Sequence, residues 1–277
     1  MTPTEQAALE AAIMAACTKH AEEHWRDNGY RGCVFIGPDY FVKYDDKESL
    51  WPQIATQLYI YNYAESQADT PRIPKVIHHF EGDQGRAYLV MEYIKLTDSP
   101  PDLHERTAEA LRWLSGVPAP PNHVIGPLGG GCIRHSFFKD NEAPLLFSSI
   151  EALERYMEKG RSRLSRLANP PVKPVRISGE RLIFTQPDIP PSNFGVDEDR
   201  KTVLLNFEET ALLPESFAMY SMSSDASFAA VADSLGWSGS SNLASMAAIS
   251  HCLWMTADPE LGLDEDGYPK AKGSRNH

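Results

Sequence analysis

The sequence is poor in cysteine, has no long uninterrupted hydrophobic stretch and has no excess of basic residues. Its four cysteines, which are scattered and form no CxxC pair, are Cys17, Cys33, Cys132 and Cys252. This pattern predicts reduced thiols in an intracellular protein and argues against a disulfide framework or a zinc site. Charged residues interrupt the alanine-rich N-terminus, so it lacks the apolar core of a secretory signal. No stretch approaches the length of a membrane span. We therefore expect a soluble, cytoplasmic protein with no membrane partner.

The charge balance is acidic, with 38 Asp and Glu against 26 Lys and Arg and a formal net charge of -12. Nucleic acids and anionic membranes are bound by clustered Lys and Arg that neutralise phosphates, so we expect neither partner. One basic pocket for a phosphorylated small molecule remains compatible with this balance. The length of 277 residues, 42% of them hydrophobic, allows one large domain or two lobes with a sizeable core. Nothing in the composition points to an oligomeric state.

Helix and strand signals alternate in the N-terminal part. Thr2 followed by Pro3 and Glu5 is typical of a helix start. Residues 33–44 predict a β-hairpin around Gly37, and residues 75–80 and 86–93 predict two further strands. Between the hairpin and the strand at 75–80 we expect a helix with an apolar face and with Pro52 in its first turn.

The pattern changes at about residue 95. A Pro-containing linker is followed by helical segments near 103–114 and 150–167 and by several more after Pro214. We therefore expect a strand-rich part, residues 1–94, and a larger helical part, residues 95–277. His78 and His79 are neighbours in a predicted strand, so they should point to opposite faces and cannot hold one metal together.

Polar residues at fixed offsets lie inside the helical part. Asp188 and Asn193 stand five residues apart, between short apolar runs. Asn206 follows 13 residues later, at the end of the next apolar run, and Glu208 comes just after it. Further upstream, Lys43 lies near the end of an apolar strand.

The order and spacing of four stretches resemble a known family. They are Phe41-Val42-Lys43, residues 88–93, residues 184–193 with Asp188 and Asn193, and Leu204-Leu205-Asn206-Phe207-Glu208. The chain resembles the protein-kinase-like fold in its aminoglycoside phosphotransferase-like branch, most of all its fungal members. The resemblance implies an α+β, two-lobed protein-kinase-like fold and a role in metabolism, such as secondary metabolism. It also implies a small-molecule substrate, with ATP and Mg²⁺ as cofactors.

Residue roles follow from this resemblance. Asp188 would take the proton of the substrate hydroxyl, while Asn193 and Asn206 would bind Mg²⁺, which prefers oxygen ligands. Lys43 would contact the phosphates, and Gln53 would occupy the place of the acidic residue that holds this lysine. Residues Tyr93 to Leu96 would form the hinge that binds the adenine. The residues implied for the nucleotide are Lys43, Gln53, Tyr93 and Ile94; those for the substrate side are Arg134, His135 and Glu208.

Several positions depart from the family pattern. Asn206 replaces the second metal-binding carboxylate, Gln53 is neutral, Gln186 stands where a histidine is common, and no glycine-rich phosphate-covering loop is present. Losing one preorganised group from such a site costs about 2.7–4 kcal/mol, or roughly 10²–10³ in rate. We therefore expect a kinase-like small-molecule-binding protein with a compromised metal site that is not an efficient ATP kinase. The glycine-rich segment 125–135 is open to two interpretations, a flexible surface loop or a substrate-side loop that presents Arg134 or His135.

Three functions stay open. A repurposed enzyme would use Asp188 as general acid/base in a cyclisation, elimination or isomerisation, and a chelator would not affect it. An ATP/Mg-dependent small-molecule phosphotransferase would use Asp188 as its base and bind ATP with magnesium. A pseudokinase-type binding or scaffold protein would keep its partner after Asp188→Asn.

Overall fold

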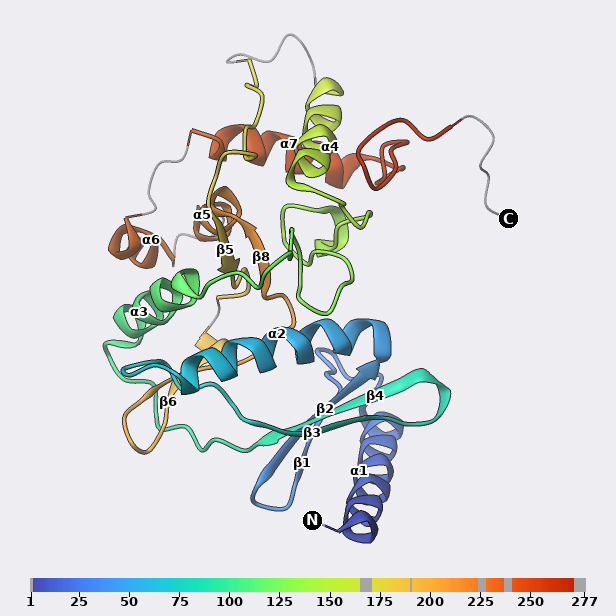
Figure 1. The fold of residues 1–277 in the computed structure, drawn as a ribbon, viewed down its shortest axis with the longest axis vertical. Coiled ribbons are helices and arrows are strands. Elements are labelled where there is room, and N and C mark those ends of the chain that lie inside the picture. Colours follow the sequence, from blue (N-terminus) through green and yellow to red (C-terminus); the bar gives the residue numbers. More distant parts are fainter. Residues whose placement is uncertain (1, 165–170, 190, 224–227, 237–240, 272–277) are drawn as a thin grey trace.

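The computed structural model describes residues 2–164, 171–189, 191–223, 228–236 and 241–271. An antiparallel sheet flanked by helices forms the N-terminal part, and the remainder is mostly helical (Figure 1), which is the predicted α+β class. The N-terminal elements are α1 (Pro3–His24), β1 (Cys33–Ile36), β2 (Tyr40–Asp46), α2 (Lys47–Glu65), β3 (Val76–Glu81), η1 (Asp83–Gly85) and β4 (Arg86–Glu92). Those that follow are α3 (Leu103–Gly116), η2 (Lys139–Asn141), α4 (Ile150–Ser162), β5 (Leu182–Thr185), η3 (Pro191–Asn193), β6 (Phe194–Val196), β7 (Thr202–Leu204), β8 (Ala211–Pro214), α5 (Glu215–Ser223), α6 (Ala229–Leu235) and α7 (Leu243–Met255).

The four-stranded sheet has the order β1-β2-β4-β3, and all its neighbouring strands are antiparallel. α1 packs on one face, where Ile13 and Cys17 are fully buried in a cluster with Val42 of β2. α2 packs on the other face and lies between the sheet and the helical part (Figure 1). Because side chains alternate along a strand, Phe41 and Lys43 point away from α1, toward the side of α2.

The two adjacent histidines of β3 lie on opposite faces of the sheet, as the sequence predicts. His78 Nε2 lies 2.7 Å from Glu10 Oε1 of α1. The ring of His79 packs edge-on against Trp51 of α2, with ring centroids 4.9 Å apart. The two rings therefore cannot share a metal ion.

Both N-terminal helices begin at a side-chain cap. The helix start predicted at Thr2 and Glu5 is present as a capping box in α1: each of the two side chains accepts a hydrogen bond from the backbone N–H of the other residue. α2 begins at Lys47, because Asp46 Oδ1 accepts a hydrogen bond from Ser49 N at 2.8 Å. Pro52 therefore lies inside the helix and not in its first turn, contrary to prediction. Having no N–H, it gives up one hydrogen bond of the helix.

The glycine-rich segment 125–135 packs directly on α2. A Cβ on Gly129 would lie 2.8 Å from Trp51 O and 2.8 Å from Pro52 Cα, so only glycine fits there without a shift. Leu128 N donates a hydrogen bond to Thr56 Oγ1 at 3.1 Å. The glycines at positions 129–131 are exposed, and at Gly129 the segment tethers α2 to the helical part.

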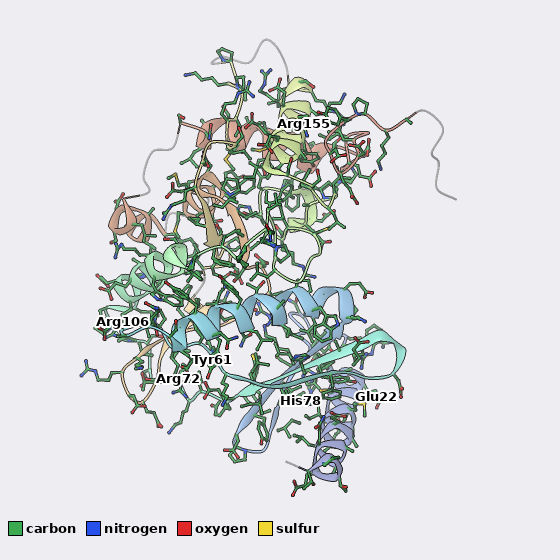
Figure 2. All side chains as sticks on the ribbon, viewed as in Figure 1. Glu22, Tyr61, Arg72, His78, Arg106 and Arg155 are labelled. Atoms are coloured by element: carbon green, nitrogen blue, oxygen red, sulfur yellow. The ribbon has the colours of Figure 1, made fainter. Side chains whose placement is uncertain are left out.

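A second tether lies beside the C-terminal end of α2, where Figure 2 labels Arg72. Arg72 donates hydrogen bonds to Asp197 Oδ2 and to Glu92 Oε2, both at 2.9 Å. Its backbone also pairs with the β6–β7 hairpin, through Arg72 N to Thr202 O and Leu204 N to Arg72 O. The sheet is thus attached to the rest of the chain at both ends of α2.

The helical part has its own core. α4 packs against α7, and α3 packs against α6 and β5. Its largest fully buried side chains include Phe137, Phe138, Tyr156 and Phe217. β5 pairs with β8 and β6 pairs with β7, so residues 186–189 and 191–193 are held next to residues 205–210. Among the described residues, no helix is long and apolar enough to cross a membrane.

Candidate functional site

A cavity of about 900 Å³ opens between the sheet, α2 and the segments around Asp188 and Asn206. Its walls bring together residues that are far apart in the sequence. Of the ten residues that the resemblance implies for the site, the cavity wall includes Lys43, Gln53, Tyr93, Ile94, Arg134, Asp188, Asn193, Asn206 and Glu208, and it does not include His135.

Hydrogen bonds hold the two polar segments of the cavity floor against each other. Leu205 N donates to Asn193 O at 2.8 Å, and Gln186 Nε2 donates to Asn206 O at 2.5 Å. Asn206 adopts a left-handed backbone conformation with φ of 56°, which Asn tolerates better than most residues. Gln186, noted in the sequence as a departure, therefore positions Asn206.

Asp188 is oriented by Asn193. The buried Asn193 donates from Nδ2 to Asp188 O at 2.9 Å and to Asp188 Oδ2 at 2.7 Å. Within the described ranges, Asp188 Oδ1 has no hydrogen bond. The carboxylate is therefore fixed by one oxygen and leaves the other free to accept a proton.

Lys43 has an amide partner and not an acidic one. Its Nζ donates to Asn206 Oδ1 at 2.6 Å, and no carboxylate in the part of the chain described lies within ion-pair distance of it. Burial lowers the pKa of Lys43 from 10.5 to about 8, and the negative charge of Glu208 opposes this only in part. The ammonium group is therefore short of compensating charge.

Gln53 lies on the cavity wall without making the expected contact. Its side chain is 2% exposed, and its Nε2 has no hydrogen-bond partner among the described residues. The resemblance implies that this position holds Lys43, but the lysine bonds to Asn206 instead. A buried amide donor without a partner costs free energy until something accepts its hydrogen bond.

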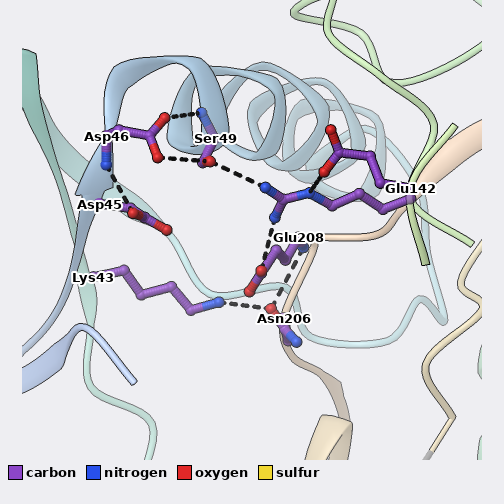
Figure 3. A network of polar contacts seen from close by, with 8 residues as sticks. Lys43, Asp45, Asp46, Ser49, Glu142, Asn206 and Glu208 are labelled. Atoms are coloured by element: carbon purple, nitrogen blue, oxygen red, sulfur yellow. Dashed lines mark hydrogen bonds and ion pairs between the residues drawn. The ribbon is translucent and has the colours of Figure 1, made fainter. Parts of the chain in front are cut away.

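Arg134 links three segments at the edge of the cavity through Ser49, Glu142 and Glu208, which are labelled in Figure 3. Its Nη1 donates to Glu208 Oε1 at 2.8 Å and its Nη2 donates to Ser49 Oγ at 3.0 Å. Its Nε lies 3.7 Å from Glu142 Oε2. Ser49 in turn bonds to Asp46, the residue that caps α2. Arg134 therefore joins α2 to the segment after β7.

His135 lies in the core and not at the cavity. It is fully buried; its Nδ1 accepts a hydrogen bond from Phe137 N at 3.0 Å, and its Nε2 lies 3.1 Å from Phe217 O. Burial lowers the pKa of His135 to about 4, so the ring is neutral at physiological pH. The sequence-based placement of His135 at the substrate side is wrong, because its neighbour Arg134 alone turns outward.

Glu209 is a cavity residue that the sequence reasoning missed. Burial, together with the negative charges of Asp188 and Glu208, raises the pKa of Glu209 to about 7. Arg134 and Arg31 act in the opposite direction. Glu209 forms no hydrogen bond or ion pair within the residues that the structure covers. The only sequence signal was its place directly after Glu208.

Aromatic rings line the end of the cavity away from Asp188. The ring of Phe35 packs against Tyr93 and Phe41, with ring centroids 5.2 Å and 5.3 Å apart. Tyr93 N donates to Asp39 O at 2.8 Å. In the described parts of the chain the backbone N–H and C=O of Ile94 make no hydrogen bond, although Ile94 lines the cavity and is 8% exposed. Within the described residues, this end therefore offers aromatic side chains beside one free donor and one free acceptor.

Neither of the two donors named for magnesium, Asn193 and Asn206, fits the ion. Mg²⁺ takes six oxygen ligands in near-ideal octahedral geometry, usually including carboxylates. Asn206 Oδ1 already accepts from Lys43 Nζ, and Glu208 N lies 3.4 Å from it. Asn193 turns its amide nitrogen toward Asp188. No group of three or more His, Cys, Asp and Glu in the described segments could hold a metal ion. The donor set therefore does not match the ion that the fold implies.

Comparison with known proteins identifies the fold. The structure resembles the GDP complex of wild-type aminoglycoside 2'-phosphotransferase-IIIa, with a TM-score of 0.51, 11% identity and coverage of 87% of this chain and 88% of that one. A GDP complex of a point mutant of that enzyme gives the same score and identity, with 87% of each chain covered. A ternary complex of aminoglycoside phosphotransferase APH(4)-Ia with AMP-PNP and hygromycin B gives 0.49, 14% identity and coverage of 80% and 81%. No protein-family model matches the chain, and neither does any curated protein. The first two matches show the fold, a kinase-like arrangement with an N-terminal sheet and a helical C-terminal part.

Proposed function

We propose that the cavity binds a nucleoside phosphate together with a small hydroxyl- or amine-bearing molecule, and that Asp188 takes a proton from this molecule. One observation carries the proposal: the Asp188 carboxylate, oriented by Asn193, opens on the same cavity as the ammonium of Lys43. Phosphoryl transfer depends on positioning and charge neutralisation more than on covalent chemistry. The chain is then a small-molecule phosphotransferase in type.

In this proposal the two ends of the cavity bind different ligands. Residues 1–94 form the nucleotide side, where the rings of Phe35 and Phe41 contact the base and the backbone of Ile94 offers it a donor and an acceptor. Residues 95–277 form the substrate side, with Asp188 and Arg134. A solved structure that shares this fold holds GDP, which supports a nucleotide in the cavity.

Transfer is slow in this proposal. Asn206 supplies no negative charge, and its side-chain oxygen is already bonded to Lys43. Losing one preorganised group from a charge-stabilising site lowers the rate by roughly 10²–10³. The chain therefore binds its ligands well and transfers a phosphoryl group poorly, as a degenerate member of the phosphotransferase fold would.

The test is an ATP titration followed by thermal unfolding. A ligand at 100 times its Kd stabilises the folded state by about 2.7 kcal/mol, which raises the melting temperature by several degrees. Asp188→Asn should keep this shift and lose any turnover, because its amide cannot accept the proton. Absence of a shift at millimolar ATP, with and without Mg²⁺, refutes the proposal.

A second candidate function is favoured by Glu209. A carboxyl group whose pKa is raised to near neutral pH is suited to act as a general acid or base. Glu209, with a pKa of about 7, lines the same cavity as Asp188. The pair could catalyse an isomerisation, elimination or cyclisation of a small molecule without a nucleotide. This alternative predicts turnover that persists in EDTA without ATP and is lost in both Asp188→Asn and Glu209→Gln.

A further inference from the structure

The surroundings of Lys43 and Gln53 point to a binding subsite that works without a metal. Lys43 Nζ has a neutral partner, Asn206 Oδ1, at 2.6 Å. The buried Gln53 Nε2 has no partner among the described residues. Both side chains line the same cavity. An ammonium short of negative charge and an unused amide donor together require an anionic ligand that accepts hydrogen bonds.

Among the described residues, no carboxylate that lines the cavity lies within ion-pair distance of Lys43. Glu208, the acidic residue that acts most on Lys43, forms its ion pair with Arg134 at 2.8 Å. At the other end of the cavity, Glu92 is held by Arg72. Arg31, which also lines the cavity, makes no ion pair in the described ranges and adds positive charge near Lys43. Within the described chain, the Lys43 ammonium is therefore paired with no carboxylate, although acidic residues such as Asp188 and Glu209 line the same cavity.

Asn206 explains why a metal is not required. A metal ion at this place would need the oxygen that Lys43 already occupies, and the two cations would repel each other. The ammonium of Lys43 thus takes the role of positive charge in the cavity. Gln53 Nε2 adds a hydrogen bond that strengthens when its acceptor is charged.

We propose that Lys43 and Gln53 form a metal-independent subsite for the terminal phosphates of a nucleoside diphosphate or triphosphate. Gln53 is then a direct phosphate-binding residue and not a holder of the lysine. The inference rests on the proposed function, because it takes the nucleotide as the ligand of this cavity. It adds the statement that the phosphates are bound by side-chain donors alone.

The experiment is calorimetric titration of the full chain with ADP, once in EDTA and once in excess Mg²⁺. Equal affinity in the two buffers supports the proposal. Gln53→Met, which keeps the size of the side chain and removes the donor, should weaken binding in EDTA about 10- to 100-fold, the loss expected for one hydrogen bond to a charged group. Lys43→Met should weaken it at least as much. The matched control is Lys75→Met, at an exposed lysine outside the cavity, and should bind ADP as the wild type does.

The possible failures are distinguishable. Binding of ADP only in Mg²⁺ overturns the metal-independent subsite and leaves the proposed function standing. Equal binding of ADP by wild type and Gln53→Met overturns the role of Gln53. If ADP binds in neither buffer, the next titration uses pyrophosphate in EDTA. Pyrophosphate binding that depends on Gln53 and Lys43 supports the anion subsite and refutes nucleotide binding as the function. Absence of pyrophosphate binding overturns both the subsite and the proposed function.

Discussion

Lys43→Met replaces a half-buried ammonium by an apolar side chain of similar length. In the folded protein, burial lowers the pKa of Lys43 from 10.5 to about 8. Between these two pH values the unfolded chain binds a proton that the folded chain does not. The free energy of unfolding of the wild type therefore rises with pH across this window. Below pH 8 both states are protonated, and the cost of burying the charge is fully present.

The size of the effect follows from the two pKa values. One pKa unit corresponds to 1.36 kcal/mol, so the shift from 10.5 to about 8 amounts to about 3 kcal/mol. Between pH 8 and 10.5 the wild type should gain this amount relative to Lys43→Met, which has no group to titrate there. Comparing the two proteins cancels other groups that titrate at alkaline pH, such as Tyr44 and Tyr88, whose pKa values are raised by burial.

Urea unfolding at several pH values measures this difference. The groups that act on Lys43 are Glu208, Cys33 and Arg31, and of these Cys33 also titrates in the alkaline range. The comparison should therefore be repeated in a Cys33→Ala background. Lys75→Met provides an exposed-lysine control whose stability should follow that of the wild type at every pH. If the difference in the free energy of unfolding between wild type and Lys43→Met does not change with pH, the idea that the Lys43 charge lacks compensation is refuted.

Three further predictions concern the contacts of α2 and the cavity residue Glu209. Gly129→Ala should lower stability by about 1–3 kcal/mol in urea unfolding, because its Cβ would press on the backbone of Pro52. At Gly116 nothing lies within 4 Å of an added Cβ, so Gly116→Ala should leave the free energy of unfolding unchanged or raise it. An equal loss of stability in the two variants would contradict the packing argument. Arg134→Met removes the hydrogen bonds to α2 and to the segment after β7, so amide hydrogen exchange in the first turn of α2 should speed up; unchanged exchange would show that the loop alone fixes the helix. Glu209→Gln should gain stability relative to wild type as pH rises from 4.5 to 7, because folded Glu209, with a pKa of about 7, keeps a proton that the unfolded chain has lost. If the difference in the free energy of unfolding between the two proteins does not change over this pH range, the raised pKa of Glu209 is refuted.

Local signals predicted the secondary structure well. The Thr2–Glu5 box marked the start of α1, and the turn at Gly37 marked the hairpin that carries Lys43. Each of these signals is complete within a few residues, so it can be recognised without knowledge of the tertiary fold. The overall kinase-like order of elements rested on spacing between such signals and agrees with the fold matches.

What the sequence could not predict depends on long-range packing. Arg134 and His135 are adjacent, yet one faces the cavity and the other is fully buried beside Phe217. The contact between Lys43 and Asn206 joins residues 163 positions apart. Glu209 acquires its raised pKa from burial and from Asp188, neither of which is visible in a run of two glutamates. Environment, not residue type, decides these cases.

The most direct measurement of the central claim is a crystal structure of the full chain with ADP, grown in EDTA. The account predicts the base between the aromatic end of the cavity and the backbone of Ile94. It predicts the terminal phosphate within hydrogen-bond distance of Lys43 Nζ and Gln53 Nε2. A structure with ADP outside this cavity, or with its phosphates turned away from Lys43, would contradict the account.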